Sequence, residues 1–270
     1  MSAAGVRSAW IDGIALWAPR LPGWEQAAAV LQGEREPPDE PARRPSPSLL
    51  PPTERRRAPD TVAVSMEVAA RACESAGVDP AQTASVFAST HGDLAISDYM
   101  CETLAKAPAL TSPTKFHNSV HNAAAGYWTI ATDCYEPYTA VSAFEHTFGQ
   151  GLLEALVQAE TSGAPVLYVA YDIEAKGPMA TIVPSRSMLG AALVISPAAS
   201  TRTQAALAWE VVASPTPATR ARPASLALAG GNEMATCLPL FESLAAGDGL
   251  VGLSLGPGLL LRLGVSQVQG

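Results

Sequence analysis

The stretch that decides the fold is Ser112-Pro-Thr-Lys-Phe-His-Asn-Ser-Val-His-Asn-Ala-Ala-Ala-Gly126, which continues through Ala131-Thr-Asp-Cys-Tyr-Glu-Pro137 into Tyr138-Thr-Ala-Val-Ser-Ala-Phe-Glu-His-Thr-Phe-Gly-Gln-Gly151. It predicts a helix, a turn, a strand over 138–143, a sharp corner and a second helix. The N–H groups and the dipole of that second helix point at the corner and favour negative charge there. A Cys or Ser at such a corner has a lowered pKa and an oxyanion hole. This chain has Phe144 there instead.

The flanking sequence alternates between helical and strand patterns. Val62, Met66, Ala69 and Cys73 share one helix face, which ends at Gly77. A second helix, capped by Ser162-Gly163, has the apolar face Phe148, Leu152, Ala155, Leu156 and Ala159. Strands are predicted over 84–90, before a turn at 91–93, and over 166–171 and 191–195. Strands buried on both faces between helices predict a layered α/β/α fold.

The two ends of the chain differ from this rhythm. A short strand is predicted over 9–17, and the proline- and arginine-rich segment 33–60 reads as a mobile surface loop. Its triplet Arg55-Arg56-Arg57 is expected either to be solvated or to bind an acidic partner. From residue 198 onward we expect strands over 206–212, 225–229, 250–255 and 259–265, with a helix over 234–246.

Composition narrows the function classes. The 270 residues are 48% hydrophobic and 16% charged, below the usual quarter, which indicates surface hidden in a subunit interface. The net charge of −8 argues against nucleic acid and anionic membranes. We see no membrane span, no secretory signal and no paired cysteines, and therefore expect a cytoplasmic protein with reduced thiols.

The segment around the corner resembles the β-ketoacyl synthases of the thiolase superfamily. Asn118, Asn122, Ala125-Gly126 and Glu136-Pro137 match the lead-in to the nucleophile, and Ser142-Ala143 match the residues just before it. The resemblance extends more weakly over 62–197. It implies one thiolase-like domain spanning 1–270, with 198–270 as a shortened second half that ends in the loop Leu255-Gly-Pro-Gly258.

Phe144 falls on the nucleophile position of that family, and a phenyl ring cannot attack a thioester. The family's second-half histidines and lysine are also missing, because no histidine follows His146 and no lysine follows Lys176. The resemblance therefore points to the chain-length factors, ketosynthase-like subunits that lack the active cysteine. Short versions accompany the ketosynthases of aryl polyene and xanthomonadin-type pigment synthesis.

The resemblance further implies a heterodimer with an active β-ketoacyl synthase, which itself receives the acyl carrier protein. No cofactor is expected. Phe144 can be read as a core residue, and the resemblance also places it in an acyl pocket formed by Ala143, Phe144, Glu145 and His146. The two interpretations are compatible. The strand over 138–143 and a helix over 115–126 are expected at the subunit interface, through Lys115, His117, Asn118, His121, Asn122, Thr139, Ala140, Val141 and Ser142.

Other interpretations stay open. Ser142 and His146 suggest the nucleophile and base of a small acyl-transferring or hydrolytic enzyme, although GxSxG is absent. His117 and His121, at i and i+4 of the predicted helix, have a spacing that can hold Zn²⁺, but backbone hydrogen bonds are the favoured interpretation. Cys134 precedes the turn and is read as structural. A homodimeric acyl-binding protein is the last alternative.

Overall fold

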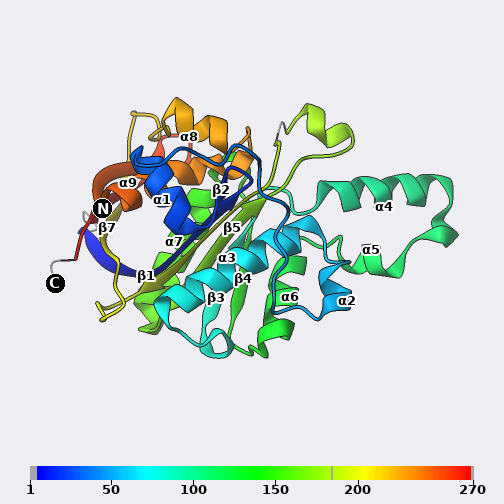
Figure 1. Cartoon of the computed structure of the whole chain (residues 1–270), viewed down its shortest axis with the longest axis horizontal. Helices are drawn as coiled ribbons and strands as arrows, with labels where there is room; N and C mark the ends of the chain where they lie inside the picture. Colours follow the sequence, from blue (N-terminus) through cyan, green and yellow to red (C-terminus); the bar gives the residue numbers. More distant parts are fainter. Residues whose placement is uncertain (1–4, 184, 269–270) are drawn as a thin grey trace.

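The computed structural model describes residues 5–183 and 185–268, which fold around one twisted nine-stranded sheet (Figure 1). The strand order is β4-β3-β5-β6-β1-β7-β9-β8, with β2 paired to the end of β1. Strands β3, β4 and β5 run parallel, and the remaining pairs are antiparallel. The strands are β1 (Arg7–Ala18), β2 (Leu21–Pro22), β3 (Ala84–Ala88), β4 (Tyr138–Val141), β5 (Val166–Asp172), β6 (Leu189–Ser196), β7 (Ala205–Ala213), β8 (Asp248–Gly256) and β9 (Leu259–Ser266).

Helices cover both faces of this sheet. One face packs against α3 and α6, and the other against α7, α9 and α1. The α-helices are α1 (Trp24–Gln32), α2 (Pro52–Arg55), α3 (Asp60–Ala76), α4 (Leu94–Lys106), α5 (Pro113–His117), α6 (Ala123–Thr132), α7 (Thr147–Ser162), α8 (Pro223–Leu228) and α9 (Leu238–Ala246). Short 3-10 turns are η1 (Pro80–Gln82), η2 (Pro108–Leu110), η3 (Phe144–His146), η4 (Pro178–Thr181) and η5 (Glu233–Cys237). Among the described residues, no helix is long and apolar enough to cross a membrane.

Strand β5 shows why the sheet lies in the middle. All seven of its side chains are buried, and they alternate between two separate hydrophobic cores. Val166, Tyr168 and Ala170 face α7, whereas Leu167, Val169 and Tyr171 face α3 and α6. This alternation follows from the period of two of a strand, and it makes the three-layer α/β/α arrangement predicted from the sequence.

Two glycines let helix α7 lie between distant parts of the sheet. A methyl group on Gly149 would overlap the carbonyl oxygen of Ser254 in β8. One on Gly151 would lie 2.8 Å from both Ala88 Cβ in β3 and Tyr168 Cε2 in β5. The sequence Gly149-Gln-Gly151 therefore brings the backbone of α7 against β8 and the side chains of β3 and β5.

Most predicted elements are confirmed. Helix α3 ends at Gly77 and α7 at Gly163, both in the left-handed conformation expected of a C-terminal cap. The strand predicted over 225–229 is wrong, because α8 occupies that position. Pro223 begins this helix, and the following Ala and Leu residues are good helix formers. The second half thus keeps three antiparallel strands, β7, β9 and β8.

The segment 33–60 is tied to the surface by two of its arginines. Arg44 donates to Asp60 Oδ1 at 2.5 Å and to the Ala58 carbonyl, and Arg55 donates to the Leu50 carbonyl at 2.8 Å. Leu50 and Ala58 are buried. The arginine triplet is therefore divided, since Arg55 is used internally while Arg56 and Arg57 remain exposed.

Replacing Gly149 with Ala should lower the free energy of unfolding by about 1–3 kcal/mol, the usual range for overpacking a well-packed site. Gly126→Ala in α6 is the matched control, because its added methyl group has no atom within 4 Å. That control should be neutral or stabilising by up to about 1 kcal/mol. Urea unfolding of both variants tests the packing, and equal midpoints would show that α7 is not held closely at Gly149.

Candidate functional site

The corner between β4 and α7 lies at 143–146, as predicted. Phe144 has φ 49°, so it is one of three described non-glycine residues with positive φ. This left-handed backbone costs about 1–2 kcal/mol for a residue with a Cβ. The chain therefore keeps a strained strand-to-helix corner while placing a phenyl ring on it.

Local hydrogen bonds hold the corner in this shape. The Ala143 N–H donates to Thr147 Oγ1 at 2.9 Å, and that hydroxyl donates to the Phe144 carbonyl at 2.6 Å. Just before the corner, Ser142 Oγ donates to the Thr90 carbonyl at 2.8 Å. These bonds satisfy backbone groups at the turn, where the strand ladder has ended and α7 has not yet begun.

The Phe144 side chain points outward and is 73% exposed. The interpretation of Phe144 as a core residue is therefore wrong for the chain by itself. Its ring meets His91 edge to face, with centroids 6.1 Å apart. Partial burial and the neighbouring His121 lower the pKa of His91, which favours a neutral imidazole beside the phenyl ring. His91 follows β3 and had been assigned only to a turn.

A buried carboxyl group ties the ends of β3 and β5 together beneath this corner. Asp172 accepts hydrogen bonds from Ser89 Oγ at 2.8 Å, from the Thr90 N–H at 2.9 Å and from Thr90 Oγ1 at 2.5 Å. Burial raises the pKa of Asp172 to about 6, although these donors act in the opposite direction. Sequence reasoning missed this contact, because its partners are more than 80 residues apart.

The single helix predicted over 115–126 is wrong. Helix α5 ends at His117, and α6 begins only at Ala123. The intervening residues include Asn118, Ser119 and Asn122, whose side chains compete for backbone hydrogen bonds and favour turns. His117 and His121 therefore do not share a helix face.

The two histidines have separate contacts. His121 Nε2 lies 2.7 Å from the Ser89 carbonyl oxygen. The His117 ring instead packs edge to face against the Tyr127 ring, with the ring centroids 6.4 Å apart. The backbone hydrogen bond predicted in place of a metal role is confirmed for His121. Within 5–183 and 185–268, no group of three or more His, Cys, Asp or Glu residues is placed to hold a metal ion.

The other residues expected at the interface lie around the same edge. The Lys115 ammonium sits 3.6 Å from the Tyr99 ring centre and joins α5 to α4. Asn122 Nδ2 donates to the Tyr138 hydroxyl at 3.0 Å. Asn118 is buried, and its Oδ1 has no hydrogen-bond partner.

Strand β4 is one edge of the sheet, and its register fixes which groups face out. The Pro137 and Val141 carbonyls accept from Ser85 and Ser89, next to β3. By alternation Thr139 also bonds toward β3, so the N–H and C=O of Tyr138 and Ala140 point away from the sheet. On the side-chain faces, Thr139 Oγ1 accepts from Gln158 of α7, while Val141 packs against the core on the α7 side.

The proposed Ser142–His146 pair is not formed. Ser142 is bonded to Thr90, and His146 Nδ1 lies 2.8 Å from Ser254 Oγ of β8. Sequence spacing suggested the wrong serine, because the true neighbour is 108 residues away. Cys134 is buried, and its thiol donates to the Thr83 carbonyl at 3.7 Å, as expected of a structural cysteine.

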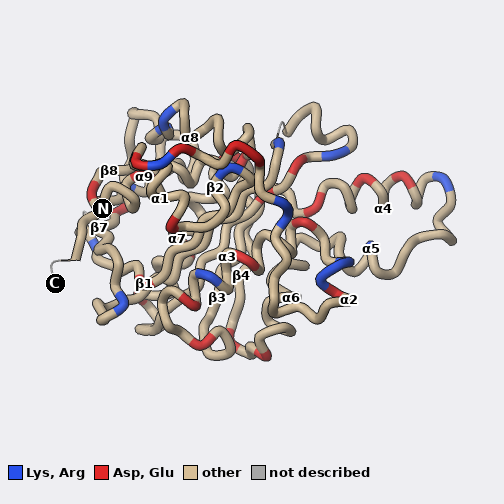
Figure 2. Tube along the Cα trace, viewed as in Figure 1, with Lys and Arg blue, Asp and Glu red and all other residues tan. Residues whose placement is uncertain are grey.

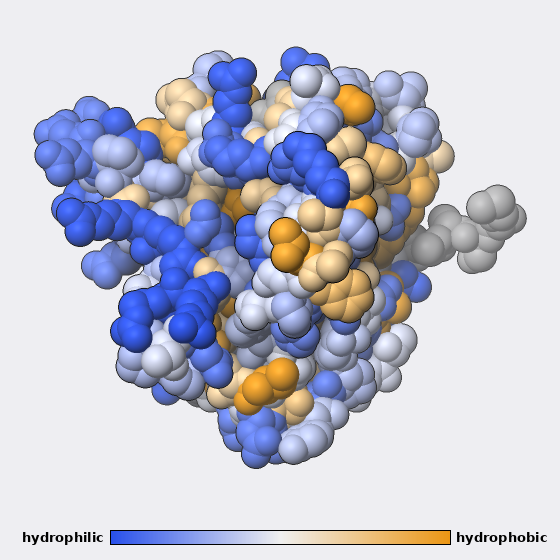
Figure 3. All heavy atoms as spheres, turned by 90° about the vertical axis from the view of Figure 1, so that its right-hand side faces the viewer, coloured by the Kyte–Doolittle hydropathy of each residue, from blue (hydrophilic) through white to orange (hydrophobic). Residues whose placement is uncertain are grey.

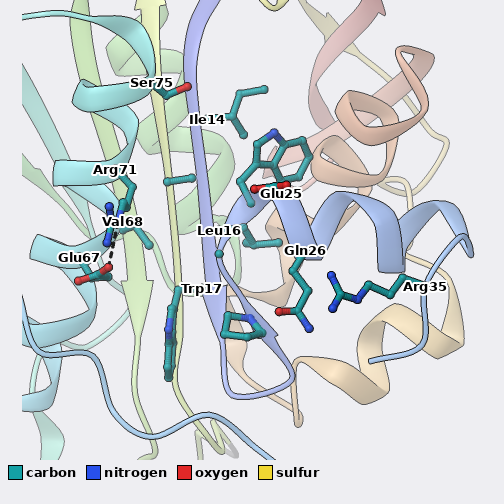
Figure 4. Close-up of a pocket in the computed structure, with 14 residues that line it drawn as sticks. Ile14, Leu16, Trp17, Glu25, Gln26, Arg35, Glu67, Val68, Arg71 and Ser75 are labelled. Atoms are coloured by element: carbon teal, nitrogen blue, oxygen red, sulfur yellow. Dashed lines mark hydrogen bonds and ion pairs between the residues drawn. The ribbon is translucent and has the colours of Figure 1, made fainter. Parts of the chain in front are cut away.

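An open pocket lies away from the corner at Phe144. It has a volume of about 590 Å³ and lies between β1, the start of α1 and the Glu67–Arg71 pair of α3 (Figure 4). None of the corner residues lines it. Along the chain trace, charged residues lie mostly at the periphery, and the central strands contain few of them (Figure 2).

Apolar side chains are exposed on the elements around the corner. The face at the α4–α5 end shows apolar patches among polar ones (Figure 3). Exposed apolar residues of α4, α5 and their loops are Leu104, Leu110, Phe116 and Val120. Three more apolar or aromatic residues are exposed nearby: Ile130 on α6, Tyr135 in the turn that follows α6, and Tyr138 on the edge strand β4.

Comparison with known proteins places the chain in a family. Residues 23–238 match the β-ketoacyl synthase N-terminal domain. The chain therefore belongs to the β-ketoacyl synthase family and has its thiolase-like fold. A comparison with curated protein sequences gives no match.

Solved structures share this fold at low identity. One is a ketosynthase in complex with its chain length factor from Xenorhabdus doucetiae, with 20% identity, a TM-score of 0.71 and coverage of 95% of this chain and 99% of that one. The ishigamide ketosynthase/chain length factor has 14% identity, a TM-score of 0.66 and coverage of 97% and 100%. A type II polyketide synthase acyl-carrier protein in complex with its ketosynthase has 8% identity, a TM-score of 0.72 and coverage of 98% and 100%.

The raised pKa of Asp172 makes its contribution to stability depend on pH. The folded chain holds this proton up to about pH 6, whereas an unfolded Asp releases it near pH 4. Stability from protonated Asp172 is therefore present below pH 4 and is lost as the pH rises to about 6. Relative to wild type, Asp172→Asn should gain stability over that window, at up to about 1.4 kcal/mol per pH unit. Urea unfolding between pH 4 and pH 7 measures this, and a constant difference between the proteins would contradict it.

Proposed function

We propose that this chain is a subunit of the chain-length-factor type that is non-catalytic in condensation, pairs with an active β-ketoacyl synthase and shapes its acyl pocket. The observation that carries the proposal is Phe144, exposed at φ 49° on the strand-to-helix corner. This is the position where the family resemblance places the nucleophile. A chain with this corner but without a thiol on it has the backbone shape of the site and lacks the nucleophile that condensation needs.

Condensation needs more than the nucleophile. The extender unit must be decarboxylated and the thioester polarised, work that calls for hydrogen-bond donors and proton carriers. The four histidines, His91, His117, His121 and His146, all precede α7. No histidine or lysine lies in β6–β9 or α8–α9, so the second half lacks the histidine and lysine proton carriers that condensation in this family calls for.

Strand β4 supports a subunit interface. It offers the free N–H and C=O groups of Tyr138 and Ala140 along an edge that is only four residues long. An equivalent strand of a ketosynthase can pair antiparallel with it across a pseudo-twofold axis, which would cover the exposed edge. With the exposed apolar residues of α4–α6, the buried area should exceed about 2,000 Å², the obligate class.

In such a dimer Phe144 would lie near the end of an acyl tunnel that begins at the partner's cysteine. Ala143, Glu145 and His146 form the rest of that wall. The carrier protein would dock on the catalytic partner, since this chain carries a net charge of −8 and carrier proteins are acidic. We place the pair in aryl polyene-type pigment synthesis in the cytoplasm, with 1–270 acting as one domain.

The structural neighbours support the same assignment, because two of their descriptions include a chain length factor. A homodimer of this chain is the second candidate, and the same β4 edge favours it, since two copies can pair there as well. Co-expression with a ketosynthase from the same genome, followed by sizing, separates the two.

Ala140→Pro should abolish the complex with the ketosynthase, because it removes an N–H that points away from β3. Thr139→Pro is less suitable, because it would break a bond inside the sheet. Ala140→Ser keeps the donor and is the matched control, and it should co-purify like wild type. If the proline variant keeps its unfolding midpoint and still co-purifies at wild-type yield, β4 is not the interface.

Phe144→Ala should leave the complex intact and lengthen the product, because it removes bulk from the end of the tunnel. Phe144→Leu should give an intermediate distribution. Mass spectrometry of products from the reconstituted pair measures the shift. An unchanged product length with both variants would remove Phe144 from the acyl pocket.

Phe144→Cys should not restore condensation in the chain alone, since a thiol at the corner still lacks the second-half proton carriers. Product formation from malonyl and acyl carrier proteins is the assay, with the wild-type ketosynthase pair as positive control. Measurable condensation by the variant without a partner would overturn the assignment as a non-catalytic subunit.

A further inference from the structure

The clearest unassigned cluster is the contact between η3 and β8. Ser254 Oγ lies 2.8 Å from His146 Nδ1, and the other ring nitrogen, Nε2, lies 3.5 Å from Glu145 Oε1. We propose that Ser254, His146 and Glu145 form a serine nucleophile site that accepts acyl groups from esters and thioesters and hydrolyses them. This activity is separate from condensation and goes beyond the proposed function.

The order of the three groups suits proton transfer. Glu145 beside Nε2 favours the tautomer with its hydrogen on Nε2, which leaves the Nδ1 lone pair facing the Ser254 hydroxyl. The same carboxylate stabilises the imidazolium that forms when His146 takes the serine proton. This arrangement has the logic of a serine–histidine–acid triad, with the roles of the two ring nitrogens exchanged.

The pair is shielded but accessible. The His146 side chain is 21% exposed and Glu145 is 77% exposed, while Ser254 is half-buried. Ser254 lies in β8, the edge strand at the far end of the sheet. Gln150 Nε2 donates to the neighbouring Leu255 carbonyl at 2.6 Å, which fixes this strand against α7.

The first turn of α7 lies beside the serine. Gly149 approaches the Ser254 carbonyl so closely that no side chain fits between them. Helix α7 has 16 residues, and its N-cap residue, His146, makes no side-chain cap bond. The Thr147 N–H already donates to the Phe144 carbonyl, so the contribution of α7 is its helix dipole, whose positive end lies near Ser254 and favours the negative oxygen that develops on an attacked carbonyl.

The chemistry needs only water as co-reactant. Ser254 Oγ attacks the acyl carbonyl, its proton passes to His146 Nδ1, and the bond from the carbonyl carbon to sulfur or oxygen breaks. The leaving thiol or alcohol takes that proton from His146. Water then attacks the acyl-serine and gives a proton to His146, the bond from the carbonyl carbon to Ser254 Oγ breaks, and Oγ takes that proton back from His146 as the free acid leaves. The exposed ring of Phe144, two residues before His146, favours acyl groups with an apolar chain.

A fluorophosphonate probe on the full-length chain tests the proposal, with peptide mass spectrometry to locate the label. We expect covalent labelling of Ser254, none at Ser254 in Ser254→Ala, and a rate at least about 100-fold lower in His146→Gln, since general-base catalysis contributes that much. Ser162→Ala is the matched control and should label like wild type, because Ser162 is exposed at the opposite end of α7. No label on Ser254 under conditions that label a serine esterase would overturn the proposal.

A second measurement separates catalysis from a merely structural contact. In Ser254→Cys the introduced thiol should react with iodoacetamide faster than the exposed Cys101 at pH 6–7, and His146→Gln should remove that advantage. Equal rates at both thiols would mean that His146 does not act as a base. Neither experiment depends on complex formation, so failure here would leave the proposed ketosynthase pairing untouched.

Discussion

The close contact of helix α7 with distant parts of the sheet is the constraint on which the rest of the structure depends. At Gly149 the backbone of α7 meets β8, and at Gly151 it meets side chains of β3 and β5. These contacts join the first half of the chain to strand β8 of the second half around one helix that is buried on its inner face. They also fix the direction in which α7 begins, and therefore where the corner at Phe144 points.

The corner between β4 and α7 keeps its backbone shape through bonds that do not involve the Phe144 side chain. A positive φ at a phenylalanine costs free energy, and the surrounding bonds from Ala143 and Thr147 hold it in place. That conformation is required by the passage from β4 into α7, whichever side chain is present. Under the proposed function, Phe144 at the nucleophile position would remove one chemistry without disturbing the shape that a partner or an acyl chain would meet.

Local patterns predicted the fold well because its elements are locally encoded. The apolar face of α3, the continuous burial of β5 and the caps at Gly77 and Gly163 are all visible within a few residues. The failures have equally local causes: Pro223 starts a helix where an apolar run suggested a strand, and the turn-forming residues between His117 and Ala123 interrupt a helix. The site was harder, because Asp172 with Thr90 and His146 with Ser254 are joined only by the tertiary fold.

Strand β4 combines two roles by alternation. The backbone groups of Thr139 and Val141 pair with β3. The side chain of Thr139 bonds to α7, and that of Val141 packs against the hydrophobic core on the α7 side. Tyr138 and Ala140 face outward, with unpaired backbone groups and exposed side chains. A register slip of one residue would exchange these roles and expose the inner set. The parallel pairing with β3 prevents that slip, so the edge presented to a partner is determined by the chain's own core.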